Sequence, residues 1–223
     1  MKDIIGKVLI SFAILGWIKA EIVFPEDDVT LNYTHIMFRW TQEPDCNLYN
    51  LVVINSSNDT TVNVHTGRTM YIDQTNFNWG QGYVAMLTPI YENENNAQTT
   101  DTISFNIGPV YTFADLNIEI INAEDTQDGL ALFSQVSPNF RMVAIDKLGN
   151  QVWNSEFAYI NHWNEHGQLF GMKDGRGVEV NFYDDILWMT PSGTEIDAHE
   201  IKQIPNGNYM GITTCLLYTS DAA

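Results

Sequence analysis

The stretch HIMFRW, residues 35–40, decides the fold class. Alternate positions along it are large and apolar, so that Ile36, Phe38 and Trp40 fall on one face of an extended chain. The stretch TISFNIG, residues 102–108, repeats this period of two. Such alternation is typical of strands that turn one face to a core. We therefore expect an all-β protein.

Several more strand-like runs lie between residues 21 and 109. LYNLVVI and GYVAMLTPI are two of them, and turn-rich segments such as SSND and NWGQG separate the runs. No helical period of useful length occurs. This pattern predicts a β-sandwich domain over residues 21–109, with Trp40 and Tyr83 in its core. The placement of these two residues resembles a fibronectin type III module, and another small sandwich stays open as the alternative.

Residues 110–214 have a different, repetitive texture. DGLALF, HGQLFG and NGNYMG place glycines 38 and 40 residues apart, and IDKLGNQVW and MTPSGTEID place glycines 44 apart. The glycines concerned are Gly129, Gly167 and Gly207, and Gly149 and Gly193. A period of about 40 residues with several short strands matches a propeller blade. We expect the first blades of a truncated β-propeller.

The N-terminus has the pattern of a secretory signal over residues 1–20. Lys2 and Lys7 precede a short apolar run, residues 8–18, which ends near the small residue Ala20. The run is short for a membrane span, which takes about 20 apolar residues. A core strand and an uncleaved anchor are the alternatives. The pattern predicts a secreted or periplasmic protein with no membrane span after signal removal.

The last nine residues, CLLYTSDAA at 215–223, continue no pattern of the repeat. They resemble the translation of a transposase adapter used to build DNA sequencing libraries. We therefore expect an adapter-derived tail, with the natural chain cut near Thr214 and this sequence forming the front part of a longer protein. A genuine C-terminal strand is the alternative.

Charge and composition exclude several kinds of partner. The chain holds 10 Lys and Arg against 28 Asp and Glu, a formal net charge of −18. Such an acidic surface repels nucleic acid and anionic lipid. Two cysteines, Cys46 and Cys215, do not make a disulfide scaffold. No C-x-x-C and no phosphate-binding glycine loop occurs, and we predict no metal and no cofactor. The acids of residues 124–129 and of Asp184–Asp185 are interpreted as turn and surface residues.

The five histidines differ in context. We expect His35 and His65 on the surface of the sandwich, and His166 occupies the turn position that Asp128 and Asn206 take in the other repeats. His162 belongs to a surface loop or points into the propeller channel, where it would bind substrate. His199 stands in DAHEIKQIPNGNYMG, residues 197–211, shortly before a Pro-Asn-Gly turn.

Two segments resemble the arylsulfate sulfotransferase family: IDKLGNQVW at 145–153 and DAHEIKQIPNGNYMG at 197–211. In that family a D-x-x-G-x-x-V-W turn recurs between blades, and a histidine leads into P-N-G-N. The resemblance implies a sandwich followed by a six-bladed propeller. It also implies sulfuryl transfer from a small phenolic sulfate donor to a phenol acceptor, without a nucleotide sulfate donor.

The resemblance assigns His199 a catalytic role as a hydrogen-bond donor to the sulfuryl oxygens. The nucleophile of the family is another histidine, which lies beyond the end of this chain, so we expect the chain alone to be inactive. The competing hypothesis is a secreted, non-enzymatic adhesion or glycan-binding propeller. Such propellers share the D-x-x-G-x-x-V-W turn, so only the His199 segment separates the two. Either reading leaves oligomer formation open.

Overall fold

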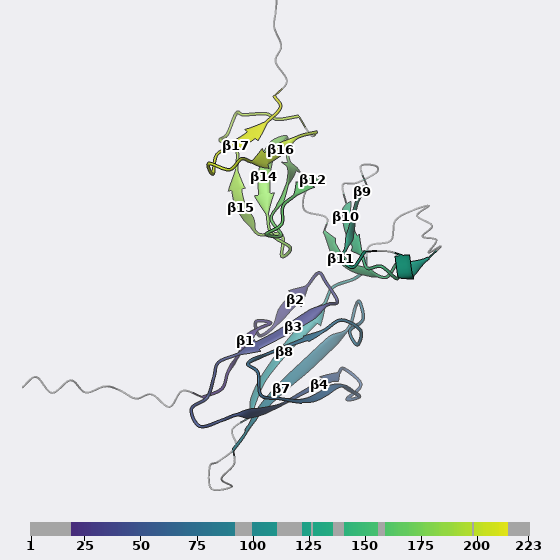
Figure 1. The fold of residues 1–223 in the computed structure, drawn as a ribbon, viewed down its shortest axis with the longest axis vertical. Coiled ribbons are helices and arrows are strands. Elements are labelled where there is room, and N and C mark those ends of the chain that lie inside the picture. The colour runs from purple at the N-terminus through teal and green to yellow at the C-terminus, as the bar shows by residue number, and fades with distance from the viewer. Residues whose placement is uncertain are drawn as a thin grey trace, which may run out of the picture. The chain divides into compact units, whose positions relative to one another are not determined.

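The computed structural model describes residues 19–91, 100–110, 122–125, 127–135, 141–155, 159–197 and 199–213. The predicted signal run at 8–18 and the predicted tail at 215–223 lie outside them. The fold is all-β, as the alternation predicts: the described residues form seventeen strands and a single 3₁₀ turn, η1 (Ala123–Asp125). None of these residues belongs to a helix with the length and apolarity needed to cross a membrane. Two compact units make up the chain (Figure 1).

The first unit comprises Met1–Asp27, Met37–Ile72 and Tyr83–Ser104. Its strands are β1 (Ile22–Phe24), β3 (Ile36–Trp40), β4 (Leu48–Asn55), β5 (Thr60–Thr66), β6 (Met70–Asp73), β7 (Gly82–Ile90) and the beginning of β8 (Asp101–Ile107). One sheet has the order β1-β3-β6. In the other, β4 pairs antiparallel with β5 on one side and β7 on the other.

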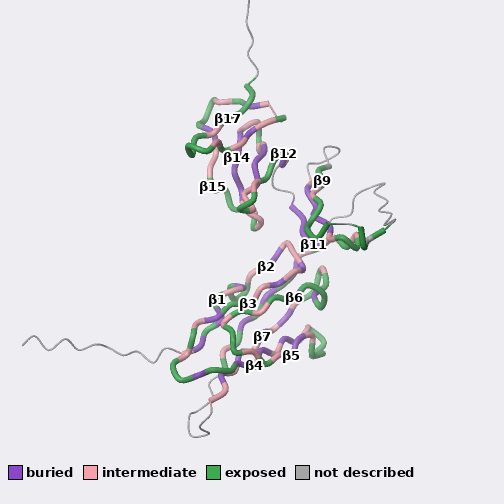
Figure 2. Tube along the Cα trace, in the orientation of Figure 1, coloured by how far each residue is buried: buried purple, intermediate pink, exposed green. Residues whose placement is uncertain are grey.

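The core of the first unit follows from side-chain alternation. Every second residue of β4 and β7 is buried along most of each strand, as the alternating colours in Figure 2 show. Trp40 and Tyr83 are both buried, as predicted. The ring of Trp40 meets the ring of Tyr49 edge-on, with centroids 5.6 Å apart. This contact joins a strand of one sheet to a strand of the other, so the unit has two layers around one core.

The second unit comprises Asp28–Ile36, Asp73–Gly82 and Phe105–Ala223. Its strands are β2 (Val29–Leu31), β9 (Ala131–Gln135), β10 (Arg141–Ile145), β11 (Gln151–Ser155), β12 (Tyr159–Trp163), β13 (Leu169–Lys173), β14 (Arg176–Val180), β15 (Ile186–Met189), β16 (Ile201–Gln203) and β17 (Tyr209–Gly211). β2 pairs in parallel with the end of β8. The others form antiparallel meanders, ordered β11-β10-β9, β12-β13-β14-β15 and β16-β17.

The four-stranded sheet of the second unit is buried on both faces. Ile160, Leu169 and Val178 on one face share a cluster with Met142 and Trp153 of the three-stranded sheet. On the other face, Phe170 packs with Ile196 and Ile201, beside the β16-β17 hairpin. The three sheets are therefore stacked, each burying a face that it could not bury alone.

One hairpin turn recurs in both units. At Asp146, Asn164, Asn181 and Asn55, the side-chain Oδ1 accepts the backbone N–H groups two and four residues later, at 2.8–3.1 Å. The fourth residue of each turn has a positive φ, for example 80° at Gly149 and 75° at Gly167. Asx turns of this kind fix the hairpin register through the side chain of their first residue.

The turn explains part of the predicted repeat. Gly149, Gly167 and Gly207 all occupy the positive-φ position of the same backbone turn. Gly193 is the third residue of the turn Pro191–Thr194, and Gly129 belongs to neither turn. Gly149, Gly167 and Gly207 each lie in a hairpin of a different sheet, and the same turn recurs without a glycine at Asn181–Asp184 of the four-stranded sheet. Among the described residues no sheet closes on itself, so the propeller remains a prediction.

Candidate functional site

His199 lies in a turn two residues before β16. Asp197 Oδ1 accepts its backbone N–H at 2.9 Å, and the same oxygen bonds to ring Nδ1. These hydrogen bonds from His199 hold the pKa of Asp197 below its usual range. The His199 side chain is 83% exposed. Its ring is therefore oriented by Asp197 while its other nitrogen is free to meet a ligand from solvent.

Glu200 is directed to the basic side chain of β16 and does not orient His199. Its Oε1 lies 2.5 Å from Nζ of Lys202. The hydrogen bond from Lys202 is the main reason that the pKa of Glu200 is lowered, and His162 makes a smaller electrostatic contribution. Glu200 is therefore held mainly by Lys202.

His162 lies on β12, which corrects the expectation of a surface loop. Its ring is tilted over Phe170, with centroids 5.8 Å apart. The strand register places His162 opposite Phe170, Phe170 opposite Glu179, and Glu179 opposite Trp188. One cross-strand row on one face of the four-stranded sheet thus carries a histidine, two aromatic rings and a carboxylate. His162 stands at the exposed end of this row.

Glu179 is a buried carboxylate that sequence reasoning missed. Only 3% of its surface is exposed. Its Oε1 accepts from Gln168 Nε2 and its Oε2 from the hydroxyl of Tyr209. Burial, and secondarily this bond to Glu179, raise the pKa of Tyr209 to about 12, and its ring stacks on Trp188 at 3.6 Å. The signal for Glu179 was a charge inside the apolar strand RGVEV, where only a hydrogen-bonded carboxylate is tolerated.

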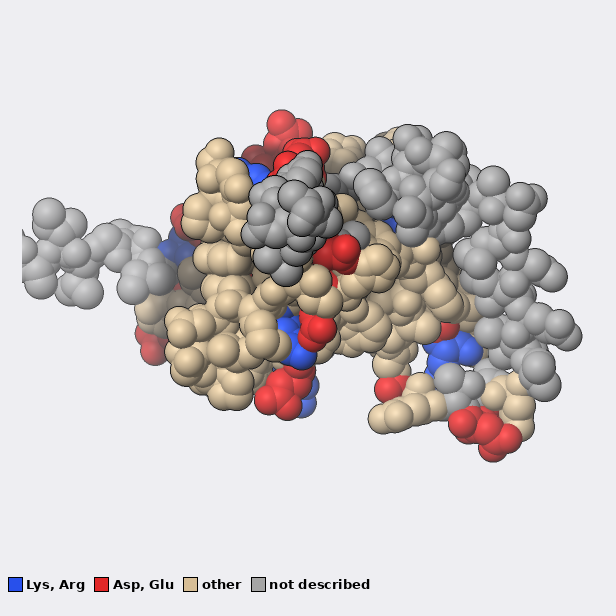
Figure 3. All heavy atoms as spheres, turned by 90° about the horizontal axis from the view of Figure 1, so that it is seen from above, with Lys and Arg blue, Asp and Glu red and all other residues tan. Residues whose placement is uncertain are grey.

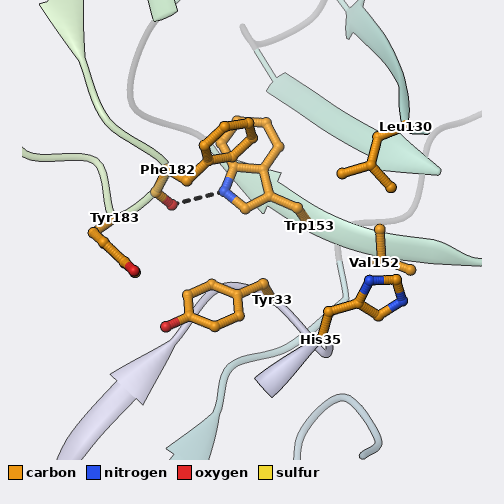
Figure 4. A pocket seen from close by; sticks show the side chains of 7 residues that line it. All are labelled: Tyr33, His35, Leu130, Val152, Trp153, Phe182 and Tyr183. Atoms are coloured by element: carbon orange, nitrogen blue, oxygen red, sulfur yellow. Dashed lines mark hydrogen bonds between the residues drawn. The ribbon is translucent and has the colours of Figure 1, made fainter. Parts of the chain in front are cut away.

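A second feature of this unit is an aromatic hollow of about 230 Å³ (Figure 4). It is lined by Tyr33, His35, Leu130, Val152, Trp153, Phe182 and Tyr183. The segment before β3 runs along β11: the N–H of Thr34 donates to the carbonyl of Val152 at 2.9 Å, and the N–H of Asn154 donates to the carbonyl of Asn32 at 3.0 Å. These bonds bring Tyr33 beside Trp153 although the two lie far apart in the sequence.

Burial is the main cause of the pKa shifts of Tyr33 and His35, which line the hollow. It raises the pKa of Tyr33 and lowers the pKa of His35, although the carboxylates of Asp146 and Asp73 act on His35 in the opposite direction. His35 is thus half-buried and not the surface residue we expected, whereas His65 is exposed as expected.

Asp184 corrects another surface assignment. It has a φ of 66° and lies in a turn, as expected, but it is half-buried. Its carboxylate accepts a 2.6 Å hydrogen bond from Ser155 Oγ and a longer one, 3.5 Å, from Asn32 Nδ2. Burial nevertheless raises its pKa. Asp184 is therefore a hydrogen-bonded, half-buried residue that directly follows Tyr183 of the hollow, and is not a free surface acid.

The acids of the described residues are dispersed. Figure 3 shows Asp and Glu scattered over the face seen there, with fewer Lys and Arg. No three side chains of His, Cys, Asp or Glu come together as a metal-binding group in the described part of the chain. Glu124 and Asp125 lie exposed on η1.

Comparisons with known proteins leave this geometry without a family. No family model matches the sequence, and no curated protein matches it. Among solved structures, the chain is similar to a segment of two fibronectin type III domains from chicken tenascin. The two share 10% identity over 77% of this chain and 94% of that one, with a TM-score of 0.28. A TM-score this low does not establish a common fold.

Proposed function

We propose that this chain is part of a secreted or periplasmic arylsulfate sulfotransferase, in which residues 110–214 supply the first blades of a propeller. The main support for this proposal is the position of His199, directly before β16. β16 is the first strand after a complete four-stranded meander. In a propeller of stacked four-stranded blades, the first strand of each blade borders the central channel. A closed ring takes four to eight such blades, more than the sheets described above.

The local chemistry supports His199 as a donor to sulfuryl oxygens. A transferring sulfuryl group carries negative charge on its non-bridging oxygens, and a positioned donor stabilises that charge. Because Asp197 holds ring Nδ1, Nε2 is the nitrogen that we propose meets the substrate. Nε2 donates only when both nitrogens are protonated, so the proposed role requires the imidazolium form. His162, on the exposed end of its row, is the proposed second substrate contact.

The alternative is a non-enzymatic adhesion or glycan-binding propeller. The exposure of His199 favours it, because catalytic donors act most strongly in water-excluded sites. The two hypotheses differ in whether a histidine at this place changes a reaction rate.

The test is sulfuryl transfer from phenyl sulfate to a phenol by the protein that the complete gene encodes. We expect His199→Ala to lower the rate by about 10²–10³, the usual loss for one oxyanion donor. His199→Asn should retain part of the rate, since an amide still donates. A covalent sulfuryl-enzyme intermediate should still form in His199→Ala, because another histidine is the nucleophile.

His166→Ala is the matched control, because His166 is another exposed histidine in a turn. Its rate should equal that of the wild type. An undiminished rate in His199→Ala would refute the site assignment. A wild-type protein that transfers no sulfuryl group from any phenolic donor would favour the binding propeller.

A further inference from the structure

The aromatic hollow contains neither His199 nor His162, so it is separate from the proposed sulfuryl site. We propose that this hollow binds the quaternary ammonium group of a small organic cation, with the faces of Tyr33 and Tyr183 as its main walls. The inference rests on the shape and charge of the hollow and does not depend on the proposed transferase activity.

Ring geometry is the first argument. Tyr33 and Tyr183 lie with centroids 5.7 Å apart and planes inclined by 58°, and Trp153 and Phe182 lie 5.3 Å apart at 79°. In Figure 4, Tyr33 lies across the hollow from Trp153, with Tyr183 on a third side. Aromatic faces carry negative partial charge, and several rings around one space form the cage that recognises quaternary ammonium groups.

Hydrogen-bond capacity is the second argument. The indole N–H of Trp153 already donates to the carbonyl of Phe182 at 2.8 Å. Leu130 and Val152 add aliphatic surface. The indole donor of the wall is therefore already used. The polar groups left in the lining are the hydroxyls of Tyr33 and Tyr183, which interact with each other, and the ring of His35; the rest of the wall consists of ring faces and apolar groups. A quaternary ammonium group donates no hydrogen bond and suits such a wall, whereas a sugar needs several polar partners to replace its hydration.

Charge is the third argument. Of the described side chains that line the hollow, none is Lys or Arg. Asp184 follows Tyr183 directly, and Asp73 and Asp146 act on His35 at the opposite part of the lining. Lys173 is the basic side chain that acts on Asp184. With a chain charge of −18, the surrounding field attracts a cation and repels an anion.

The volume sets the ligand size. At about 230 Å³ the hollow is smaller than the roughly 300–1,000 Å³ typical of sites for drug-sized ligands. It therefore suits a group such as the trimethylammonium end of choline, and a larger cation would protrude into solvent.

The test compares choline with 3,3-dimethyl-1-butanol by calorimetric titration of the full 223-residue chain. The two probes have the same shape and differ in the charge of one atom. We expect choline to bind more tightly by roughly threefold to thirtyfold, the range that corresponds to a cation–π contribution. Equal affinity would show an apolar hollow without cation recognition and would overturn the proposal, as would binding of neither probe.

Variants at Tyr183 test the location. Tyr183 is 49% exposed and Trp163, which does not line the hollow, is 50% exposed, so Tyr183→Ala and Trp163→Ala are matched losses of an exposed ring. We expect Tyr183→Ala to abolish the preference for choline, and Tyr183→Phe and Trp163→Ala to keep it. Near-ultraviolet circular dichroism checks that each variant is folded. An unchanged preference in folded Tyr183→Ala, or its loss in folded Tyr183→Phe, would overturn the proposal.

Discussion

The two units build their sheets by different local rules. The first has long strands, with 8 residues in β4 and 9 in β7, and side-chain alternation decides which face is buried. In the second, no strand beyond β8 exceeds 5 residues among those described, and Asx turns with a positive-φ residue set the register. Short strands carry too few alternating positions to fix a register alone. Where the strands are short, the turns and not the alternation of side chains fix the register.

The largest expected effect is loss of a core ring in the first unit. Phe38 is fully buried, whereas Arg39 beside it is exposed. Phe38→Ala should lower the free energy of unfolding by about 3–5 kcal/mol, and Arg39→Ala should change it by less than about 0.5 kcal/mol. Urea denaturation measures both. Similar losses in the two variants would show that alternation does not define this core.

A close backbone approach in the second unit gives the next effect. A Cβ at Gly171 would overlap the carbonyl oxygen of Tyr159 and lie 2.8 Å from the Cα of Ile160. Gly171→Ala should therefore cost about 1–3 kcal/mol, as overpacking does. Gly108→Ala is the control, because its Cβ would meet only ordinary contacts at 3.5 Å and beyond. Equal stability of the two variants by thermal denaturation would contradict this packing of β12 on β13.

The hairpin rule itself is tested at Gly167. Its φ of 75° is strained for an L-residue, and a Cβ there would find Phe182 at an ordinary 3.5 Å. Gly167→Ala should cost about 1–2 kcal/mol from backbone strain alone. Gly167→Asn should cost less, because Asn tolerates this conformation. If both variants melt like the wild type, turn geometry does not limit the second unit.

The sequence was sufficient for the parts of the structure that depend on near neighbours. Alternation in HIMFRW predicted the buried faces of Ile36, Phe38 and Trp40, and the turn glycines Gly149, Gly167 and Gly207 were recognised as such. A glycine count does not find every turn of this kind, because Asp184 fills the same positive-φ position as those glycines.

The candidate site was predicted only in part. His199 was singled out from its segment, but neither its contact with Asp197 nor the place of His162 on β12 was predicted. Tyr33 lies beside Trp153 because backbone hydrogen bonds join segments some 120 residues apart, such as the bond from the N–H of Asn154 to the carbonyl of Asn32. No local pattern encodes such a pairing. The same holds for Glu179 and Tyr209, which meet through the stacking of two sheets.

The smallest expected effect concerns His35. We expected this residue on the surface of the sandwich, but it is half-buried and lines the hollow. Burial lowers its pKa from the ordinary 6.5, against the carboxylates of Asp146 and Asp73. Between 6.5 and the lowered value, the unfolded chain binds more protons at this site than the folded chain does. This contribution to stability is therefore complete above about pH 6.5 and is lost as the pH falls through that window.

The melting temperature of the wild type should drop more on acidification from pH 7.5 to 5 than that of His35→Gln, which cannot titrate. Because carboxylates titrate in both proteins, the difference between the two curves is the quantity to measure. A constant difference would show that His35 is as solvated as the alternation around HIMFRW had predicted, and a difference of opposite sign would show that Asp146 and Asp73 outweigh burial.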